Sequence, residues 1–208
     1  MHDYAIDRHP KQKVLFALAF LSITITPFVN STLSQAASSL GYSNAWVTTI
    51  GTAVPVFVMF GLLYLFFDRY LWKWAPLRKL LLVPDLNGIW RCEGETALKK
   101  GEPADFTWQS TITISQSWSK MLIHLKTEQS SSSSTSASIF HEQGVGYRLL
   151  YQYKNEPRAD ELELSNHAGS AEIKFSEDCL TGEGHYYTDQ HRNTVGTMSL
   201  RREDVHSP

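Results

Sequence analysis

A run of serines between two strand-like segments holds the first residues whose type and spacing could bind a ligand. Residues Ser130 to Ser138 read SSSSSTSAS and lie between Leu122–Lys126 and Ile139-Phe140. Successive side chains of a strand point to opposite faces, so alternate serines would line one face with hydroxyls. Inside a barrel, such small side chains would leave a polar hole instead of a packed core. A flexible low-complexity loop is the alternative for the same residues.

Catalytic or metal-binding residues are not signalled by the sequence. Cys92 and Cys179 are far apart and match no metal-ligand spacing, and we expect both to be reduced in the cytoplasm. The histidines of the second half show no pair at ligand spacing on one strand face. Gly182-Glu183-Gly184 is no phosphate loop, because no helix is expected after it. We therefore expect no enzyme, no catalytic residue, no metal and no cofactor.

The serine run belongs to a region of short alternating strands. Ile112 and Ile114 alternate with Thr111 and Thr113, and similar alternation recurs near residues 121–126, 147–153, 161–164 and 173–175. Turn-forming residues separate these segments, which predicts about eight strands at a spacing of roughly 10–12 residues. A meander of this length loses its exposed edges best by closing into a barrel. An eight-stranded barrel has room for its own side chains or for one small ligand.

The first third of the chain has a different character. The 54 positions from Val14 to Phe67 contain no Asp, Glu, Lys, Arg or His. A membrane helix needs roughly 20 apolar residues, and residues 14–33 and 46–67 each supply such a span. A cleaved signal peptide or a buried helical hairpin is the alternative. The hydroxyls of both spans, Ser22 and Thr26 among them, could bond across helices or back to their own helix.

Charges beside the two spans predict their orientation. Lys and Arg lie before the first span and after the second, and the connecting loop has none, so both flanks should be cytoplasmic. The expected fold class is a membrane α-helical hairpin plus an all-β C-terminal domain, a small meander β-barrel of about eight strands. The expected parts are an N-terminal flank (1–13), two transmembrane helices (14–67) with a short periplasmic loop, a basic and aromatic connector (68–84) and the barrel (85–208).

Several short stretches occur in the order typical of one family. They are Leu86-Asn87-Gly88-Ile89-Trp90, the serine-rich segment, Tyr151-x-Tyr153-x-Asn155-x-Pro157-Arg158, His167-x-Gly169, and Gly184-x-Tyr186-Tyr187-Thr188 with Arg192 and Gly196-Thr197 after it. With two N-terminal spans, this order resembles the two-transmembrane β-barrel effectors of bacterial CBASS anti-phage systems, the CD-NTase-associated receptors for cyclic dinucleotides. The resemblance implies a protein of the bacterial inner membrane that binds a cyclic dinucleotide from a cognate nucleotidyltransferase. It further implies that the protein then forms homo-oligomers, disrupts the bilayer and kills the infected cell.

A cyclic dinucleotide needs aromatic rings for its bases and donors for its phosphates. The residues expected to supply them are Ser132, Ser134, Ser136, Tyr151, Tyr153, Asn155, Arg158, Tyr186, Thr188 and Arg192. Other roles stay open for several of them. Tyr151 and Tyr153 could be barrel core, Asn155 could serve a turn, and Arg158 and Arg192 could be solvated surface charges.

The charge balance opposes long nucleic acid as a partner. Residues 80–208 carry 12 basic and 18 acidic side chains, a net charge of -6, whereas residues 1–79 carry +4. Long nucleic acids are held by many phosphate contacts, which an acidic domain cannot offer. A ligand with two phosphates needs only a few local donors. The alternative functions are a membrane-tethered, lipocalin-like binder of a small molecule, a barrel with a filled core that docks a partner, and an unrecognised hydrolase.

Overall fold

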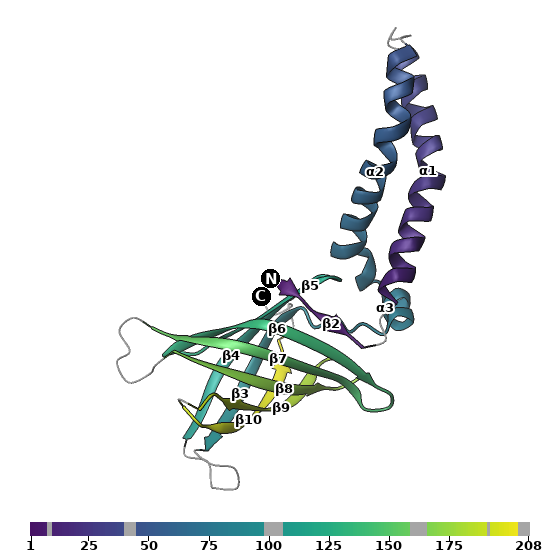
Figure 1. The fold of residues 1–208 in the computed structure, drawn as a ribbon. Helices are drawn as coiled ribbons and strands as arrows, with labels where there is room; N and C mark the ends of the chain where they lie inside the picture. Colours follow the sequence, from purple (N-terminus) through teal and green to yellow (C-terminus); the bar gives the residue numbers. More distant parts are fainter. Residues whose placement is uncertain (8–9, 40–44, 98–105, 159–165, 191, 204–208) are drawn as a thin grey trace. The chain divides into compact units, whose positions relative to one another are not determined.

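The chain folds into two compact units, His9–Leu77 and Met1–Arg8 together with Arg78–Pro208. The computed structural model describes residues 1–7, 10–39, 45–97, 106–158, 166–190 and 192–203 (Figure 1). The strand expected near residues 161–164 lies outside the described residues, as do residues 40–44 of the loop expected between the two apolar spans.

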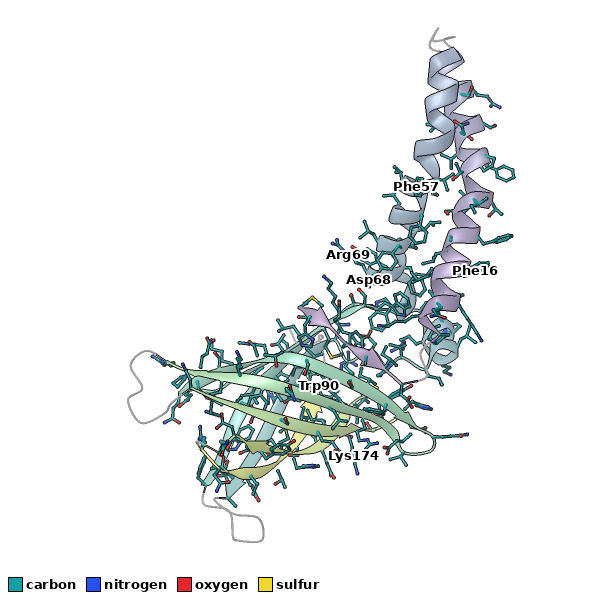
Figure 2. The ribbon with its side chains drawn as sticks, in the orientation of Figure 1. Phe16, Phe57, Asp68, Arg69, Trp90 and Lys174 are labelled. Carbon is teal, nitrogen blue, oxygen red and sulfur yellow. The ribbon has the colours of Figure 1, made fainter. Side chains whose placement is uncertain are left out.

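The first unit is a pair of long helices, α1 (Lys11–Ser39) and α2 (Ala45–Arg69), which pack against each other. A 3-10 turn, η1 (Leu71–Lys73), follows, and the short helix α3 (Ala75–Leu81) crosses the boundary between the units. Large apolar side chains point away from the pair: Phe16 is 76% exposed and Phe57 is 81% exposed (Figure 2). Such outward apolar surface is typical of helices that face lipid. Among the described residues, Lys11–Ala36 is the helix long and apolar enough to cross a membrane.

Hydroxyl groups of α1 bond within their own helix. Ser22 Oγ donates to the Ala19 carbonyl at 2.7 Å, and Thr26 Oγ1 donates to the Ser22 carbonyl at 2.6 Å. Both side chains are buried, and Leu18 is buried one turn before them. Of the two roles expected for these hydroxyls, the structure therefore has the one within the helix.

The second unit is a closed antiparallel barrel, which confirms the expected fold class. Its eight strands are β3 (Gly88–Ala97), β4 (Phe106–Gln116), β5 (Lys120–Lys126), β6 (Ser130–Glu142), β7 (Gly146–Pro157), β8 (His167–Phe175), β9 (Thr181–Thr188) and β10 (Val195–Arg202). Each strand pairs with the next along the chain, β10 returns to β3, and a pairing of β5 with β6 completes the ring. The serine run lies in β6, so the strand interpretation of Ser130–Ser138 is confirmed.

One end of the barrel is a packed apolar core around Trp90, which is fully buried (Figure 2). Its ring lies 4.9 Å from that of Phe175, centroid to centroid, and its Nε1 donates to the Leu86 carbonyl at 3.1 Å. The guanidinium of Arg202 lies 5.5 Å from the centre of the Trp90 ring. The Gly88-Ile89-Trp90 stretch therefore closes this end by packing.

Two short strands near the N-terminus also belong to the barrel unit. The strand β1 (His2–Asp3) pairs antiparallel with β5, and β2 (Ala5–Ile6) pairs parallel with β6 (Figure 1). The sequence predicted only a flank for residues 1–13. Two-residue strands carry no periodic pattern, so their pairing is decided by the partner strands.

Candidate functional site

A cavity of about 140 Å³ occupies the barrel near Thr96, six residues along β3 from Trp90. Seven of the ten expected ligand-binding residues line it: Ser132, Tyr151, Tyr153, Asn155, Tyr186, Thr188 and Arg192. They come from strands β6, β7 and β9 and from the turn before β10. Strand alternation points these side chains inward, and closure of the barrel brings them together.

Aromatic rings line the cavity because glycines lie opposite them on the neighbouring strands. Trp108 pairs with Gly94, and a Cβ built on Gly94 would lie 2.1 Å from the Trp108 ring. Tyr153 pairs with Gly169, where a Cβ would lie 2.4 Å from the Tyr153 ring. Tyr186 pairs with Gly196, where a Cβ would lie 2.5 Å from the Tyr186 ring. The missing side chains let these rings lie against the wall, which leaves space in the lumen.

Three polar groups fix two of these rings. The hydroxyls of Thr96 and Tyr186 lie 2.5 Å apart and share a hydrogen bond. Trp108 Nε1 donates to both oxygens, at 3.0 Å to Thr96 and 3.2 Å to Tyr186. The two rings meet edge to face with their centroids 5.9 Å apart. The cavity therefore presents preformed aromatic surfaces on which a flat ring could stack.

Asn155 brings an unpaired donor to the cavity. Its side chain is 6% exposed, and its Nδ2 atom has no hydrogen-bond partner. Leaving such a donor unsatisfied costs about 1–3 kcal/mol, so buried donors almost always have partners. The arrangement is suited to a ligand that places an acceptor, such as a carbonyl or ring nitrogen, beside this amide.

The charge at the cavity differs from that of the barrel as a whole. Among its described lining residues there is no Asp or Glu, and Arg192 has the one permanent charge. Burial holds the pKa of Tyr153 well above its usual value, although the charge of Arg192 acts in the opposite direction. Burial likewise raises the pKa of Tyr151. Both phenols therefore stay protonated and can donate hydrogen bonds at neutral pH.

Thr188 also has an architectural role. Its Oγ1 accepts a hydrogen bond from the Thr194 backbone N–H at 2.9 Å and lies 3.1 Å from Thr194 Oγ1. These bonds join the end of β9 to the residue before β10 and hold the turn that carries Arg192. The turn also contains Asn193, whose φ of 49° lies in the left-handed region that asparagine tolerates.

Three expected site residues lie outside this cavity. Ser134 is buried in the wall, where its Oγ accepts from the Ile123 N–H at 2.9 Å and lies 2.7 Å from His2 Nε2. Ser136 is exposed, because the register of β6 shifts between Ser134 and Ser136 and the alternation is lost. Ser134 thus keeps the inward alternation of Ser132 but lies outside the cavity, and the shift turns Ser136 outward. A role of either serine in ligand binding stays a prediction.

Arg158, the third, is exposed and lines an outer cavity of about 1270 Å³. Its Nη1 donates to the Glu128 carbonyl at 3.3 Å. The outer cavity shares Thr127 and Ser130 with the inner one, so the two are neighbours.

Sequence reasoning missed several residues of the cavity, including Thr96, Trp108, His167 and Met198. A signal in the sequence was present for Trp108. Its pairing with Gly94 could have been suspected from a glycine within one expected strand and a large ring in the next. Within the described part of the chain, no group of three or more His, Cys, Asp or Glu side chains is placed to hold a metal ion.

Comparisons with known proteins agree with both units. Residues 81–202 match the family described as the Cap15 cyclic dinucleotide receptor domain, and residues 12–73 match the family described as the Cap15 TM helices. A CD-NTase-associated protein 15 from Yersinia aleksiciae is 44% identical over 140 residues, which are 67% of this chain and 65% of the relative. A protein of the same name from Staphylococcus schleiferi is 26% identical over 166 residues, 76% of this chain and 80% of the relative.

The chain thus spans just under two thirds of the length of the Yersinia relative. The receptor-domain match by itself covers more than half of the present chain and most of the barrel, including every strand from β3 to β10. The family expected from the order of the sequence motifs is therefore confirmed, and the chain belongs to the Cap15 family of CBASS proteins, with a cyclic dinucleotide receptor domain and TM helices.

Proposed function

We propose that this chain is a membrane effector of anti-phage defence whose barrel binds a cyclic dinucleotide in the cavity beside Asn155. The observation that carries the proposal is the composition of that cavity. It joins fixed aromatic rings, an unpaired buried amide donor and one arginine, without any acidic side chain among its described lining residues. Rings suit bases, the amide suits a base edge, and the arginine suits a phosphate.

The size of the cavity indicates how such a ligand would lie. An engineered protein cavity of about 150 Å³ holds one benzene molecule. A cavity of about 140 Å³ is therefore suited to one nucleobase and not to a whole dinucleotide. The second base and the phosphates would lie at the mouth, where Arg192 lines the inner cavity and Arg158 lines the neighbouring outer one.

The helices α1 and α2 are the part through which ligand binding would lead to cell death. In this proposal α1 and α2 both cross the bacterial inner membrane, with both chain ends in the cytoplasm and the short loop in the periplasm. Ligand binding promotes association of several copies, and their grouped helices disrupt the bilayer. A ligand can shift this balance only through its higher affinity for the associated state.

Calorimetry on the full-length chain in detergent tests the binding step. Cyclic di-GMP, cyclic di-AMP and mixed cyclic dinucleotides are titrated separately, with the linear dinucleotides as matched controls. We expect heat of binding from at least one cyclic ligand and larger particles by light scattering after it is added. The absence of binding heat from every cyclic dinucleotide in the panel would contradict the receptor proposal.

Co-expression with the cognate nucleotidyltransferase tests the killing step. We expect entry of a membrane-impermeant dye and loss of viable cells only when both proteins are active. Binding without dye entry would leave a receptor whose output is not membrane disruption.

A further inference from the structure

The eight-stranded ring is closed between β5 and β6 by a short ladder. The pairing of β5 with β6 covers only His124–Lys126 against Ser131–Ser133. Beyond that point β5 continues toward Lys120 and β6 toward Glu142 without pairing with each other. The two strands therefore diverge and leave a gap between two strand edges. Strand edges of this kind are templates for pairing with another segment.

Residues 2–7 fill this gap in the chain itself. His2 and Asp3 pair with Met121 and Lys120 of β5. Ala5 and Ile6 pair with Ser138 and Ile139 of β6, and the N–H of Asp7 donates to the Ile139 carbonyl at 2.9 Å. One short segment is thus shared between two strand edges.

Side chains give the segment its specificity. Tyr4 is 3% exposed; its hydroxyl accepts from Gln116 Nε2 at 3.0 Å and donates to the Ser117 carbonyl at 3.2 Å. Ile6 is also buried. His2 Nε2 lies 2.7 Å from Ser134 Oγ, the hydroxyl that caps the end of the β5–β6 ladder through the Ile123 N–H.

Strand β6 connects the gap to the ligand cavity. Ser132 lines the cavity, Ser134 binds His2, and the register shift of β6 follows Ser134 directly. A ligand that moves Ser132 would therefore move the residue that anchors the N-terminal segment. Only four residues separate Ile6 from Lys11, the first residue of α1.

We propose that the gap between β5 and β6 is the surface through which copies of the chain associate, with residues 2–7 of one copy docking into the gap of the next. In a neighbouring copy, the exchanged segment makes the same contacts that it makes within its own chain. The free-energy difference between the exchanged and unexchanged states is therefore small. Residues 2–7 are held in place by two-residue strands and by the buried side chains of Tyr4 and Ile6. So few contacts place this segment among those that open locally.

Exchange would also explain how assemblies grow. Each copy donates one segment and receives another, which is a head-to-tail contact that need not close on itself. Anchoring copies in one membrane raises their effective concentration for such exchange. The inference rests on the proposed function, because the cyclic dinucleotide is the signal that releases the segment.

Disulfide trapping tests the exchange in full-length chains reconstituted in lipid vesicles. Asp3 and Lys120 are exposed and lie directly opposite each other in the β1–β5 pair, a position suited to a disulfide. One preparation carries D3C and K120C on the same chain, and another mixes chains with D3C alone and chains with K120C alone. A matched control mixes D3C chains with K174C chains, because Lys174 is an exposed residue of β8 and pairs with Glu183 and Arg148 instead. The native Cys92 and Cys179 are buried with pKa values raised to about 11 by burial, so they react slowly at neutral pH.

Without ligand, we expect the double variant to form its disulfide within one chain and the mixed single variants to stay monomeric. After addition of whichever cyclic dinucleotide gives heat of binding, we expect the D3C and K120C mixture to shift to disulfide-linked dimers and the K174C mixture to stay monomeric. The double variant, oxidised before ligand is added, should still bind but should not form larger particles until a reductant is supplied.

Two results would overturn the exchange. One is ligand binding and assembly with no cross-link between mixed chains; the other is normal assembly of the oxidised double variant. Either result would be compatible with the proposed receptor function. It would show that residues 2–7 stay docked in the barrel of their own chain. Absence of any binding heat is a different outcome, which removes the proposed function and the ligand-driven exchange together.

Discussion

Among the side chains of the cavity, Asn155 is the one that we expect to gain most from the proposed ligand. Its buried Nδ2 lacks a partner, whereas the hydroxyls of Thr96 and Tyr186 already bond to each other and to Trp108. A group that is unsatisfied in the free protein gains most from an acceptor. The satisfied groups mainly hold rings in place.

Replacing Asn155 with leucine should therefore separate binding from stability. We expect the dissociation constant for the cyclic dinucleotide to rise about 10- to 100-fold, which corresponds to about 1–3 kcal/mol. The melting temperature should not fall, because the change removes an unsatisfied buried amide. Calorimetry and thermal unfolding of the full chain measure the two effects, with Q152A, an exposed change on the same strand, as the control. Equal affinity in N155L would exclude Asn155 from ligand contact.

Cys92 gives a prediction about stability and pH. Burial raises the pKa of its thiol from 9.0 to about 11, so between these values the folded chain keeps a proton that the unfolded chain loses. The free energy of unfolding therefore falls as pH rises through this window, by up to about 1.4 kcal/mol per pH unit. When the pH is raised from 8.5 to 10.5, the free energy of unfolding of C92A should fall by about 2 kcal/mol less than that of the parent chain. Guanidinium unfolding at the two pH values measures this difference. Any packing loss in C92A is present at both pH values, so parallel losses would show that the thiol does not titrate as described.

At the scale of the strands, the cavity depends on pairs of a glycine and an aromatic residue across neighbouring strands. Gly94 and Trp108 pair across β3 and β4, and Gly169 and Tyr153 pair across β7 and β8. Each ring uses the space that a side chain would take on the other strand. The size of the lumen is thus a property of strand pairs and not of single residues.

Adding one methyl group at Gly94 tests this dependence. A Cβ there would lie 2.1 Å from the Trp108 ring, so in G94A the ring must move away from the wall. We expect loss of measurable dinucleotide binding in calorimetry, with the barrel still folded by circular dichroism. The second change W108L should restore part of the stability lost in G94A, because the clash is removed. Unchanged binding in G94A, with E95A as the exposed control on the same strand, would show that Trp108 does not shape the site.

At the scale of the whole molecule, charge is divided between parts of the chain. Residues 80–208 have a net charge of -6, whereas the cavity has Arg192 and no described acid. Long-range attraction of an anionic ligand is therefore not available, and binding depends on local donors. An acidic domain can thus act as the proposed receptor for a dianion, because the charge at the cavity differs from that of the domain as a whole.

The salt dependence of association should reflect that division. Raising ionic strength from about 0.01 to 0.15 M shortens the Debye length from about 30 to about 8 Å. Screening then weakens the repulsion between the acidic barrel and the ligand, so we expect the association rate constant to increase with salt in stopped-flow fluorescence. A neutral fluorescent nucleoside provides the control and should show no such dependence. Faster association at low salt would indicate a positive surface that guides the ligand.

Local sequence patterns are enough to predict the division of this protein into apolar helices and a β domain. The uncharged stretch from Val14 to Phe67 predicts apolar helices, and the alternation around Ile112 and Ile114 predicts strands, because hydrophobic periodicity is a local property. Closure into a barrel followed from the number of strands and the lack of helices between them. It also gathered seven of the ten expected residues into one cavity, since alternation fixes which side chains point inward.

Features that depend on two strands at once could not be predicted from these local patterns and became visible in the fold. The register shift after Ser134 turns Ser136 outward, and no residue of the serine run signals where that shift falls. The pairing of Gly94 with Trp108 depends on register across a turn. The docking of residues 2–7 depends on the gap that β5 and β6 leave, because a segment of two-residue strands has no preference of its own until both strand edges are present.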